Sequence, residues 1–519
     1  MLTSPYPEVN GVKQTFSCAW NCHYCPSEPG QPRSYLHEEP AVRRANQNGF
    51  DAVLQFTDRA ATLAGNGHPL DKIELLVLGG TWASYPHAYQ EAFVRDLFYA
   101  ANTFYLRGAA KPPRRSLAAE QASNEGALVK IIGLTLETRP DTITPDELRR
   151  LRAYGCTRVQ LGLQHTDDGV LRRVNRGCGN AAAVRALRLL KDACYKVDVH
   201  LMPNLPGASP ELDEEMFRRM SCEADMQADQ WKIYPCEVTP WTAIKRWFDE
   251  GSFVPYPDEV LFQLILRAKA GVKPWVRLNR VVRDIPSQYI LGGVDAPNMR
   301  QTLALHLAAQ GRACACIRCR EVGAEAAKAP SARLTERVYP ASGGTEHFLS
   351  FETPDGATIF AFVRLRLLPP GGGAEAHTTF PRLRGCGLIR ELHVYGQLVP
   401  SLPRSGRRAD RWLGWLRGAG AGKGAEAPQH SGFGRALMAR AEQVACAHGC
   451  TGMAVIAGVG TRGYYRRLGY ELDGPEEGGF MVKRLPRLAR LRGVAGANWA
   501  RFAALLPLIF AILLWFFAG

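Results

Sequence analysis

Apolar runs rich in β-branched residues alternate with longer helical patterns between residues 73 and 284 of this 519-residue chain. Each stretch between two runs is long enough to carry a helix. The runs predicted as strands are 73–80, 130–138, 158–163, 196–202, 230–235 and 275–282. Such alternation predicts a parallel sheet or a full or partial β/α barrel, with its chemistry at the carboxyl ends of the strands.

Three cysteines, Cys18, Cys22 and Cys25, stand before this repeat at CxxxCxxC spacing. Three thiolates at this spacing can hold three irons of a four-iron cluster and leave the fourth iron open for S-adenosylmethionine. Tyr24, an aromatic residue before the last cysteine, fits the same arrangement. A zinc knuckle is the alternative, but it needs a fourth ligand, and His23 between two cysteines is a poor tetrahedral partner. We therefore expect a 4Fe-4S cluster and S-adenosylmethionine at the barrel mouth.

The overall charge favours a polyanionic partner. Lysine and arginine number 64 against 49 aspartate and glutamate residues, a net charge of +15. Such a balance suits RNA, DNA or an anionic membrane face. The chain has fourteen cysteines, and it does not open with a charged segment followed by an apolar one, as a secretion signal would. We therefore expect a reducing compartment, where thiols bind metals or lie in cores, and no secretion.

The carboxyl-terminal segment 499–519 has a very different composition. Its only charge is Arg501, and 502–517 is continuously apolar. At a rise of ~1.5 Å per residue the segment spans roughly 31 Å, about one hydrocarbon core. A buried core helix would show a polar stripe, so we predict a transmembrane tail anchor. Five basic residues in 483–492 predict a cytoplasmic flank. We expect 486–498 to be the juxtamembrane segment and the catalytic part to face the cytosol. The membrane would be the mitochondrial outer membrane or the endoplasmic reticulum.

The second half of the chain follows another pattern. Residues 348–368 alternate like a hairpin with a turn at Pro354, and 389–399 is a further strand. Residues 401–428, rich in Gly, Ala and Arg, lack a steady period and are predicted to be a flexible insertion. The expected parts before the tail are a partial barrel at 1–310, a linker at 311–345 and a second α/β domain at 346–485.

The expected linker contains Cys314, Cys316 and Cys319 at CxCxxC spacing. Three thiols this close together are a zinc signal, with a fourth ligand from elsewhere. Reduced bystander thiols are the alternative, and the sequence leaves both open.

A glycine loop follows the insertion and runs into an apolar-periodic helix. Its residues are Gln429, Gly432, Phe433, Gly434 and Arg435. Backbone N–H groups at a helix amino terminus can bind a pyrophosphate, although an ordinary helix-start turn has the same composition. The loop resembles the QxxGxG/A loop with which GNAT acetyltransferases hold the diphosphate of acetyl-CoA.

Two neighbouring segments strengthen this resemblance. The strand before the loop contains Glu391, Leu392, His393 and Val394, where GNAT folds line the acetyl thioester. Tyr464 and Tyr465 stand where these folds carry a tyrosine beside the sulfur. A phenol can protonate a leaving thiolate or hold it. The alternative is that both rings pack at the edge of the sheet.

A radical S-adenosylmethionine barrel followed by a GNAT domain is a rare pairing, and the chain resembles the family of the Elongator catalytic subunit, Elongator protein 3. The resemblance covers nearly everything from Cys18 to Arg484. The phrases that carry it include LVLGGT (76–81), GLTLETRPD (133–141), YGCTRVQLGLQ (154–164), VNRG (174–177), HLMPNLPG (200–207), WKIYP (231–235), CIRCREVG (316–323), IRELHVYG (389–396) and GVGTRGYYRRLGYELDGP (458–475).

The resemblance implies a tRNA-modifying enzyme that places a carboxymethyl group on carbon 5 of the wobble uridine. The cluster would cleave S-adenosylmethionine to a 5′-deoxyadenosyl radical, which takes hydrogen from the methyl group of bound acetyl-CoA. The resulting carbon radical would add to uridine, and water would release the product from CoA. The implied fold is an α/β chain with a partial barrel of the radical SAM type, a GNAT α/β domain and a carboxyl-terminal transmembrane helix. The implied partners are the tRNA anticodon loop and either other Elongator subunits or a second copy of the chain.

The resemblance also assigns residues. It implies that Cys18, Cys22 and Cys25 hold the cluster, and that Gly79 and Gly80 approach the methionine moiety. Lys130 matches a lysine at the acetyl-CoA site. The acetyl-CoA contacts of the second domain match residues 391–394, residues 433–435 and Tyr465, and the interdomain cysteines match a zinc site of some members.

The chain departs from the family in three places. Only seventeen residues precede Cys18, where members usually carry a basic tRNA-gripping segment, so we expect tRNA binding to depend on other parts. Gln160 replaces a glutamate common in its strand. The apolar tail is foreign to the family and indicates a specialised form on an organelle.

Two other functions compete with tRNA modification. A membrane-tethered protein lysine acetyltransferase would use the GNAT domain alone, with Glu391 or His393 as the base. A non-catalytic tRNA-binding or assembly module has no physical need for three cysteines at cluster spacing. We rank tRNA modification first, protein acetylation second and the module third.

Overall fold

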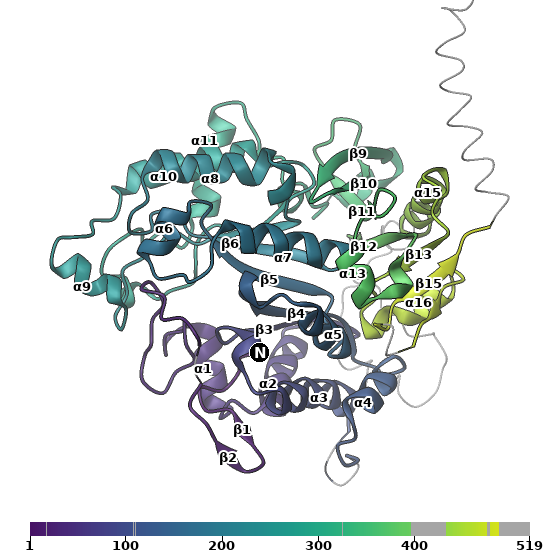
Figure 1. The fold of residues 1–519 in the computed structure, drawn as a ribbon, viewed down its shortest axis with the longest axis horizontal. Coiled ribbons are helices and arrows are strands. Elements are labelled where there is room, and N and C mark those ends of the chain that lie inside the picture. Colours follow the sequence, from purple (N-terminus) through teal and green to yellow (C-terminus); the bar gives the residue numbers. More distant parts are fainter. Residues whose placement is uncertain are drawn as a thin grey trace, which may run out of the picture.

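The computed structural model describes residues 1–16, 18–106, 108, 111–323, 325–395, 432–474 and 478–486 (Figure 1). The predicted insertion at 401–428, Gln429 and the predicted tail at 499–519 lie outside the described residues. No helix within the described ranges is long and apolar enough to cross a membrane.

The first half of the chain forms a six-stranded sheet with the strand order β3-β4-β5-β6-β7-β8. Its strands are β3 (Lys72–Val77), β4 (Lys130–Thr138), β5 (Arg158–Gln164), β6 (Lys196–Leu201), β7 (Gln230–Ile233) and β8 (Arg277–Arg280). All neighbouring strands are parallel, and spatial order follows chain order. The predicted partial barrel of parallel strands is confirmed. Crossover connections of the same handedness place each new strand at the same edge of the growing sheet.

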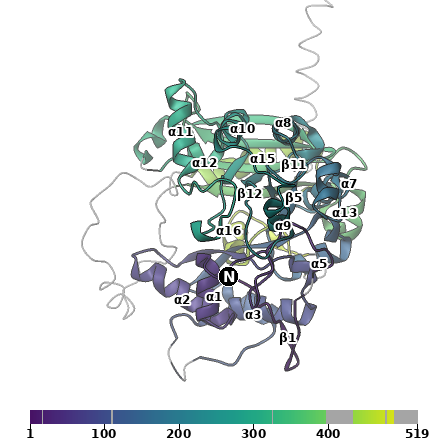
Figure 2. The same cartoon turned by 90° about the vertical axis from the view of Figure 1, so that its left-hand side faces the viewer.

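Helices cover the outer face of this sheet. They are α2 (Ala52–Gly65), α3 (His87–Thr103), α4 (Leu117–Asn124), α5 (Pro145–Ala153), α7 (Asn180–Asp192), α8 (Pro210–Cys222), α10 (Asp258–Gly271) and α11 (Met299–Ala309). Three shorter helices pack in separate apolar clusters: α1 (Pro40–Gln47), α6 (Asp168–Arg173) and α9 (Ala243–Asp249). Figure 2 shows α1, α2 and α3 at one end of the molecule and α8, α10 and α11 at the other. A short hairpin of β1 (Glu8–Val9) and β2 (Val12–Lys13) precedes them.

The two faces of the parallel sheet differ in chemistry because side chains alternate along each strand. Val197, Val199 and Leu201 of β6 are fully buried in the main apolar core, against the helices. Lys196, Asp198 and His200 alternate with them and face the concave side. The polar residues of the predicted strands therefore line the inside of the barrel.

The second half forms a seven-stranded sheet with the order β14-β15-β13-β12-β11-β10-β9. Its elements are α12 (Ile317–Arg320), β9 (Arg333–Ala341), β10 (Gly344–Glu352), β11 (Ile359–Leu367), α13 (Ala374–Thr379), β12 (Cys386–Val394), α15 (Phe433–Ala447), β13 (Gly452–Val455), α16 (Arg462–Arg466), β14 (Glu471–Leu472) and β15 (Met481–Arg484). The predicted hairpin is present as β10 and β11. Strand β9 lies inside the segment that we expected to be a linker. It belongs to the second sheet, because Arg333–Ala341 pairs along its whole length with β10.

The second sheet packs against the amino-terminal ends of the parallel strands, beside α7 (Figure 1). Arg390 of β12 bonds both oxygens of Asp229, just before β7, at 2.6 Å. Arg390 also bonds Glu346 of β10 at 2.7 Å, and all three side chains are at most 1% exposed. Arg366 of β11 bonds Asp192 at the end of α7 at 2.9 Å. Buried ion pairs of defined geometry therefore fix the two sheets relative to each other.

Candidate functional site

Residues 18–25, here called the cysteine loop, lie at the carboxyl ends of the first parallel strands. Cys22 is buried, and its sulfur accepts from Arg139 Nη1 at 3.7 Å and from Arg176 Nη1 at 3.8 Å. Arg139 directly follows β4, and Cys18 Sγ lies 3.6 Å from Thr81 Oγ1, shortly after β3. Cys22 thus lies against two buried guanidinium groups, whereas burial raises the pKa of the Cys25 thiol.

Gly79 and Gly80 form a tight turn between β3 and Thr81. Their φ values of +134° and +93° are ones that residues with a Cβ avoid. A Cβ on Gly79 would lie 1.8 Å from Thr3 Oγ1, so only glycine fits beside the amino-terminal segment.

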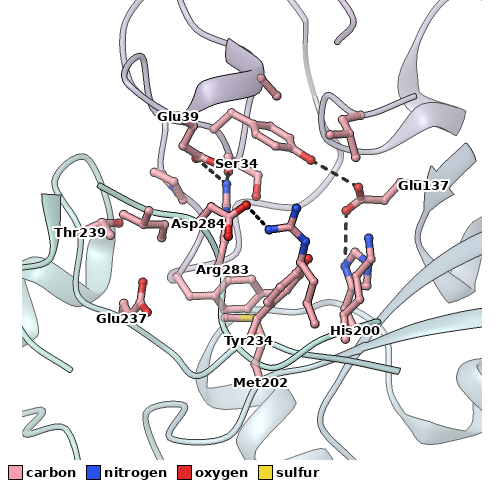
Figure 3. A pocket seen from close by; sticks show the side chains of 18 of the residues that line it. Ser34, Glu39, Glu137, His200, Met202, Tyr234, Glu237, Thr239, Arg283 and Asp284 are labelled. Carbon is pink, nitrogen blue, oxygen red and sulfur yellow. Dashed lines mark hydrogen bonds and ion pairs between the residues drawn. The ribbon is translucent and has the colours of Figure 1, made fainter. Parts of the chain in front are cut away.

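A cavity of about 230 Å³ opens beside the cysteine loop at the carboxyl ends of the strands (Figure 3). Tyr24 of the loop forms part of its wall. The sheet contributes one residue from or next to each strand: Leu78, Glu137, Gln164, His200, Lys232 and Arg280. The parallel topology therefore brings residues from distant parts of the chain to one site.

Glu137 organises the polar side of the cavity. Its carboxylate accepts from Tyr35 Oη at 3.4 Å and lies 3.5 Å from His200 Nδ1 (Figure 3). Burial raises the pKa of Glu137, and Lys232 and Arg283 oppose this rise. Burial, Lys232 and Arg283 together hold the pKa of His200 well below its usual value, so its imidazole is neutral at pH 7.

Four buried polar atoms of residues that line the cavity have no hydrogen-bond partner among the described residues. They are Tyr24 Oη, His200 Nε2, Gln164 Oε1 and Glu237 Oε2. Buried polar atoms in a folded protein are normally satisfied, so open ones beside a cavity indicate positions that a polar ligand fills.

A polar network runs along the concave face from the cavity toward the second sheet. Lys232 Nζ donates to Gln160 Oε1 at 2.7 Å, and Gln160 Nε2 donates to Asp198 Oδ2 at 3.1 Å. Asn279 Nδ2 donates to the same Asp198 oxygen at 2.9 Å. Lys196, two residues before Asp198 on β6, reaches Glu391 of β12 at 2.7 Å. The face of the barrel thus connects the cavity with the second sheet through polar side chains.

The second sheet opens between its two parallel strands. β12 pairs with β13 only from Cys386 to Ile389, and the part of the chain that the structure describes offers no partner strand on that side of its continuation to Val394. Helix α15 begins beside this opening, after Gly432 with a left-handed φ of +75°. The gap exposes backbone amides of β12 near a helix amino terminus.

Several of the residues predicted for acetyl-CoA meet at this opening. A Cβ on Gly434 would lie 2.8 Å from Tyr464 Oη and 3.4 Å from a methyl group of Val394. Phe433 stacks on Phe351 with ring centroids 4.6 Å apart, and Arg435 is exposed. Leu392 packs against the apolar core of the second sheet. His393 lies on the strand beside Tyr395, with ring centroids 4.3 Å apart.

The two neighbouring tyrosines have different environments. The Tyr464 ring is half-buried, and its hydroxyl lies over the start of α15. The Tyr465 ring is 7% exposed and packs on Tyr470 in the core of the second sheet. Tyr464 therefore presents a hydroxyl at the opening, whereas the Tyr465 ring packs in the core. The alternative interpretation, that both rings are packing residues, thus describes the surroundings of Tyr465 but not those of Tyr464.

Lys130 and Glu391 lie on the border between the sheets. Lys130 is the first residue of β4. A Cβ added to Gly460 would lie 2.7 Å from the Cβ of Lys130, so the second half of the chain packs closely on Lys130. Glu391 accepts from Lys196 at 2.7 Å and from Arg364 at 2.9 Å. Burial raises the pKa of Glu391, but Lys196 and Arg364 outweigh it and hold the pKa at about 2. Glu391 is thus a paired carboxylate and a poor general base.

Cys314, Cys316 and Cys319 converge. Their sulfur atoms lie within 4.8 Å of one another, as a single metal ion requires. Lys269 of α10, only 1% exposed, donates to Cys319 Sγ at 3.3 Å. The predicted CxCxxC motif therefore folds into a cluster of three thiols next to a buried ammonium group.

The sequence analysis missed the two arginines at the cysteine loop and three residues that line the cavity. Arg139, Arg176, Glu137, His200 and Glu237 were not among the predicted site residues. Each lies within a predicted strand or in the loop after one, so position at a carboxyl end was the available signal.

Comparisons with known proteins agree with this geometry. The model of the Radical SAM superfamily matches residues 12–220, and that of the Radical SAM C-terminal domain matches residues 228–308. The "tRNA uridine(34) acetyltransferase" of Dehalococcoides mccartyi is 37% identical over 493 residues, 93% of this chain and 96% of that protein. "Elongator complex protein 3" of Drosophila melanogaster is 36% identical over 465 residues, 88% of this chain and 78% of that protein.

A solved structure is similar as well. Elp3 of the archaeon Methanocaldococcus infernus with an amino-terminal deletion superposes with a TM-score of 0.72 at 33% identity. The match covers 85% of this chain and 97% of that one. A parallel half-barrel with a three-cysteine loop over its polar cavity, together with these matches, defines a radical SAM protein. Within that superfamily, the chain belongs to the family of Elongator complex protein 3 and tRNA uridine(34) acetyltransferase.

Proposed function

We propose that this protein modifies carbon 5 of the wobble uridine of tRNA, forming carboxymethyluridine from acetyl-CoA with S-adenosylmethionine as the radical source. The observation that carries the proposal is the position of the cysteine loop directly over a polar cavity at the strand ends. The Dehalococcoides mccartyi relative, a tRNA uridine(34) acetyltransferase that matches over nearly its whole length, supports action on this uridine.

The residues of the cysteine loop fit a 4Fe-4S cluster. Cys18, Cys22 and Cys25 are reduced and lie in one loop, and two arginines donate to Cys22. A cluster bound by them supplies an electron that cleaves S-adenosylmethionine to a 5′-deoxyadenosyl radical. Arg139 and Arg176 would compensate the negative charge of cluster and thiolates, and hydrogen bonds to cysteine sulfur tune the reduction potential.

The cavity fits a polar ligand with several hydrogen-bonding groups. Neutral His200 offers Nε2, and Gln164 offers Oε1. Gly79 and Gly80, which the resemblance assigns to the methionine moiety, would place the turn after β3 next to this ligand. These residues would hold S-adenosylmethionine beside the cysteine loop and keep water away from the radical.

We propose that acetyl-CoA binds at the opening between β12 and β13. The backbone of Glu391–Val394 would line the acetyl group, and the amides of Phe433, Gly434 and Arg435 at the start of α15 would bind the pyrophosphate. The Tyr464 hydroxyl would hold or protonate the thiolate when the product leaves CoA. The acetyl group would then face the polar concave side of the barrel, next to Lys196 and Lys130.

We further propose that the three interdomain thiols bind zinc. Their segment joins both sheets, because Ile317 N donates to Val276 O before β8 and Arg320 donates to Gly356 O after β10. A structural zinc would stabilise this joint.

The proposed function is tested with reconstituted protein under anaerobic conditions. The protein is incubated with reductant, S-adenosylmethionine, acetyl-CoA and unmodified tRNA, and the digested nucleosides are analysed by mass spectrometry. Carboxymethyluridine is expected, and it should vanish without acetyl-CoA or in Cys22→Ser. The matched control Cys222→Ser replaces an exposed cysteine at the end of α8 and should leave the product unchanged. Acetylation of a lysine peptide with neither 5′-deoxyadenosine nor modified uridine would contradict the proposal.

The membrane anchor predicted for 499–519 remains our proposal from the sequence, with the mitochondrial outer membrane or the endoplasmic reticulum as its place. A fluorescent fusion of the full chain should sediment with membranes and colocalise with one of these organelles. Deletion of 499–519 should release it, and a deleted form that stays membrane-bound would refute the anchor.

A further inference from the structure

An exposed tryptophan lies two residues after Thr239, which lines the cavity. Trp241, in the segment after β7, is 44% exposed and adopts a left-handed φ of +58°. A bulky residue in this conformation is strained, and such strain persists where the surroundings enforce it. Ser27 N, two residues after the cysteine loop, donates to Trp241 O at 3.0 Å, and Thr242 Oγ1 donates to Thr239 O at 2.7 Å. The fold therefore holds the indole outward, next to the cysteine loop.

A second aromatic ring comes from the segment after β8. Tyr289 lies 6.1 Å from Trp241 between ring centroids, at an interplanar angle of 55°. A two-residue bridge joins the segments, since Val238 N donates to Gly292 O at 2.8 Å and Leu291 N donates to Val238 O at 2.9 Å. Both segments line the cavity, through Glu237, Thr239, Asp284 and Ile285. The two rings thus belong to one wall of the cavity mouth.

Glu237 adds an open hydrogen-bonding group to this wall. The residue is 8% exposed and its Oε2 has no partner among the described residues (Figure 3). Gly293 packs on it so closely that an added Cβ would lie 3.3 Å from Glu237 Cα.

Burial keeps the carboxyl of Glu237 largely protonated at neutral pH. Burial raises the pKa of Glu237 to about 8, Asp295 and Glu39 add to the rise, and Arg283 opposes it. The neighbouring Cys236 is buried and its own pKa is raised, so it adds no charge at neutral pH. A protonated carboxyl offers a donor and an acceptor side by side.

This combination matches single-stranded RNA. Aromatic rings stack on any nucleobase, and unpaired bases are recognised by stacking together with hydrogen bonds to their edges. Arg280, exposed and also lining the cavity, and the net charge of +15 suit a polyanionic chain. The uracil edge presents an N–H next to a carbonyl, which a protonated carboxyl pairs through two hydrogen bonds.

We propose that the segments after β7 and β8 form the RNA-facing wall of the cavity. Trp241 stacks on the base next to the target, and Glu237 hydrogen-bonds the edge of the base that enters the cavity. The inference rests on the proposed function and specifies the residues that grip its RNA.

The stacking role is tested by binding of a fluorescent anticodon stem-loop RNA to the full-length chain, measured by anisotropy. Trp241→Ala should weaken binding roughly tenfold, and Trp241→Phe, which keeps a ring, only about threefold. Alanine at position 241 carries the same backbone strain as tryptophan, because both have a Cβ. The stability of the fold should therefore change little, which the melting temperatures of wild type and variant test. The control Tyr105→Ala removes a ring that is 51% exposed after α3 and should bind like the wild type.

The Glu237 role is tested by the same titration from pH 6 to pH 9. Wild-type binding should weaken as pH rises through about 8, because the carboxyl loses the proton that it donates. Glu237→Gln keeps a donor and an acceptor and should bind with a flat pH profile, whereas Glu237→Leu should bind weakly throughout.

Two results overturn the inference: wild-type affinity in Trp241→Ala, or a pH profile of Glu237→Gln that follows the wild type. A wild-type chain that neither binds nor modifies the RNA contradicts the proposed function itself. RNA binding needs no cluster, so the assay separates the two failures.

Discussion

Lys196 and Glu391 form an ion pair of 2.7 Å between the first residue of β6 and a strand of the second sheet. Their side chains are 14% and 7% exposed. Lys196 also begins the polar row of β6 that leads through Asp198 to His200 in the cavity. The ion pair therefore lies where the proposed acetyl-CoA site meets the inside of the barrel.

Removal of the Glu391 charge should destabilise the protein. Glu391→Gln leaves Lys196 without its ion-pair partner and Arg364 with only Asp229, 3.8 Å away, and breaking a buried pair costs about 3 kcal/mol. The pKa of Glu391 is about 2 in the folded protein against 4.5 as the reference, so its charge stabilises the fold above pH 4.5. Denaturant unfolding should show a difference between wild type and variant that is complete at pH 7 and shrinks as pH falls from about 4.5 toward 2. A difference independent of pH would contradict this assignment.

The contact between Arg390 and Asp229 should determine how firmly the two sheets are joined. Arg390→Met leaves Asp229 and Glu346 buried without their main partner, which should cost about 3–5 kcal/mol. The double variant Arg390→Met with Asp229→Asn should recover part of the loss, because one uncompensated charge disappears. Thermal unfolding and limited proteolysis measure both effects, and additive losses would show that the two residues are not coupled.

Arg139 should raise the reduction potential of the bound cluster. Reduction adds negative charge, which a guanidinium 3.7 Å from Cys22 Sγ stabilises. Arg139→Met should therefore shift the midpoint potential to a more negative value, as measured by redox titration followed by electron paramagnetic resonance. Arg149→Met removes an exposed arginine that pairs only with exposed Asp146, and it should leave the potential unchanged. Equal potentials in all three proteins would exclude this role.

Tyr464 and Tyr465 should behave differently although they are adjacent. Tyr464→Phe removes a hydroxyl at the proposed thioester site and should lower turnover roughly 100-fold with little change in melting temperature. Tyr465→Phe changes a ring in the core and should leave turnover nearly intact. The measurement is acetyl-CoA consumption with uridine modification as the second readout, and a larger loss in Tyr465→Phe would reverse the assignment.

Lys269 should strengthen zinc binding by the three interdomain thiols. Three thiolates with one zinc ion carry a net negative charge, which the buried ammonium 3.3 Å from Cys319 Sγ compensates. Lys269→Met should weaken zinc retention roughly 10- to 100-fold in competition with a chromogenic chelator. The control Lys328→Met changes an exposed lysine and should retain zinc like the wild type. Unchanged retention in Lys269→Met would mean that its ammonium group serves only the packing.

Local patterns predicted much of the fold. The six strands of the parallel sheet, from β3 to β8, begin within about two residues of the predicted positions. Runs of β-branched residues between helical patterns are a direct sign of buried, paired strands. The hairpin turn at Pro354 also follows from local conformational preference. The strand predicted for 73–80 instead ends at Val77, because Gly79 and Gly80 turn the chain. Strand β9 was missed, because Arg333–Ala341 is mostly exposed and its polar residues gave no apolar run.

The sequence by itself determined the order of the parallel strands, the cysteine loop before them and the glycine-started helix of the second sheet. Spacing and periodicity within a few residues encode these features. Only the tertiary structure decided that Glu391 is a paired carboxylate, that Tyr464 rather than Tyr465 presents its hydroxyl, and that Glu237 and Trp241 share a wall of the cavity. These properties depend on burial and on partners distant in the chain, such as Lys196 and Ser27, which packing alone brings together.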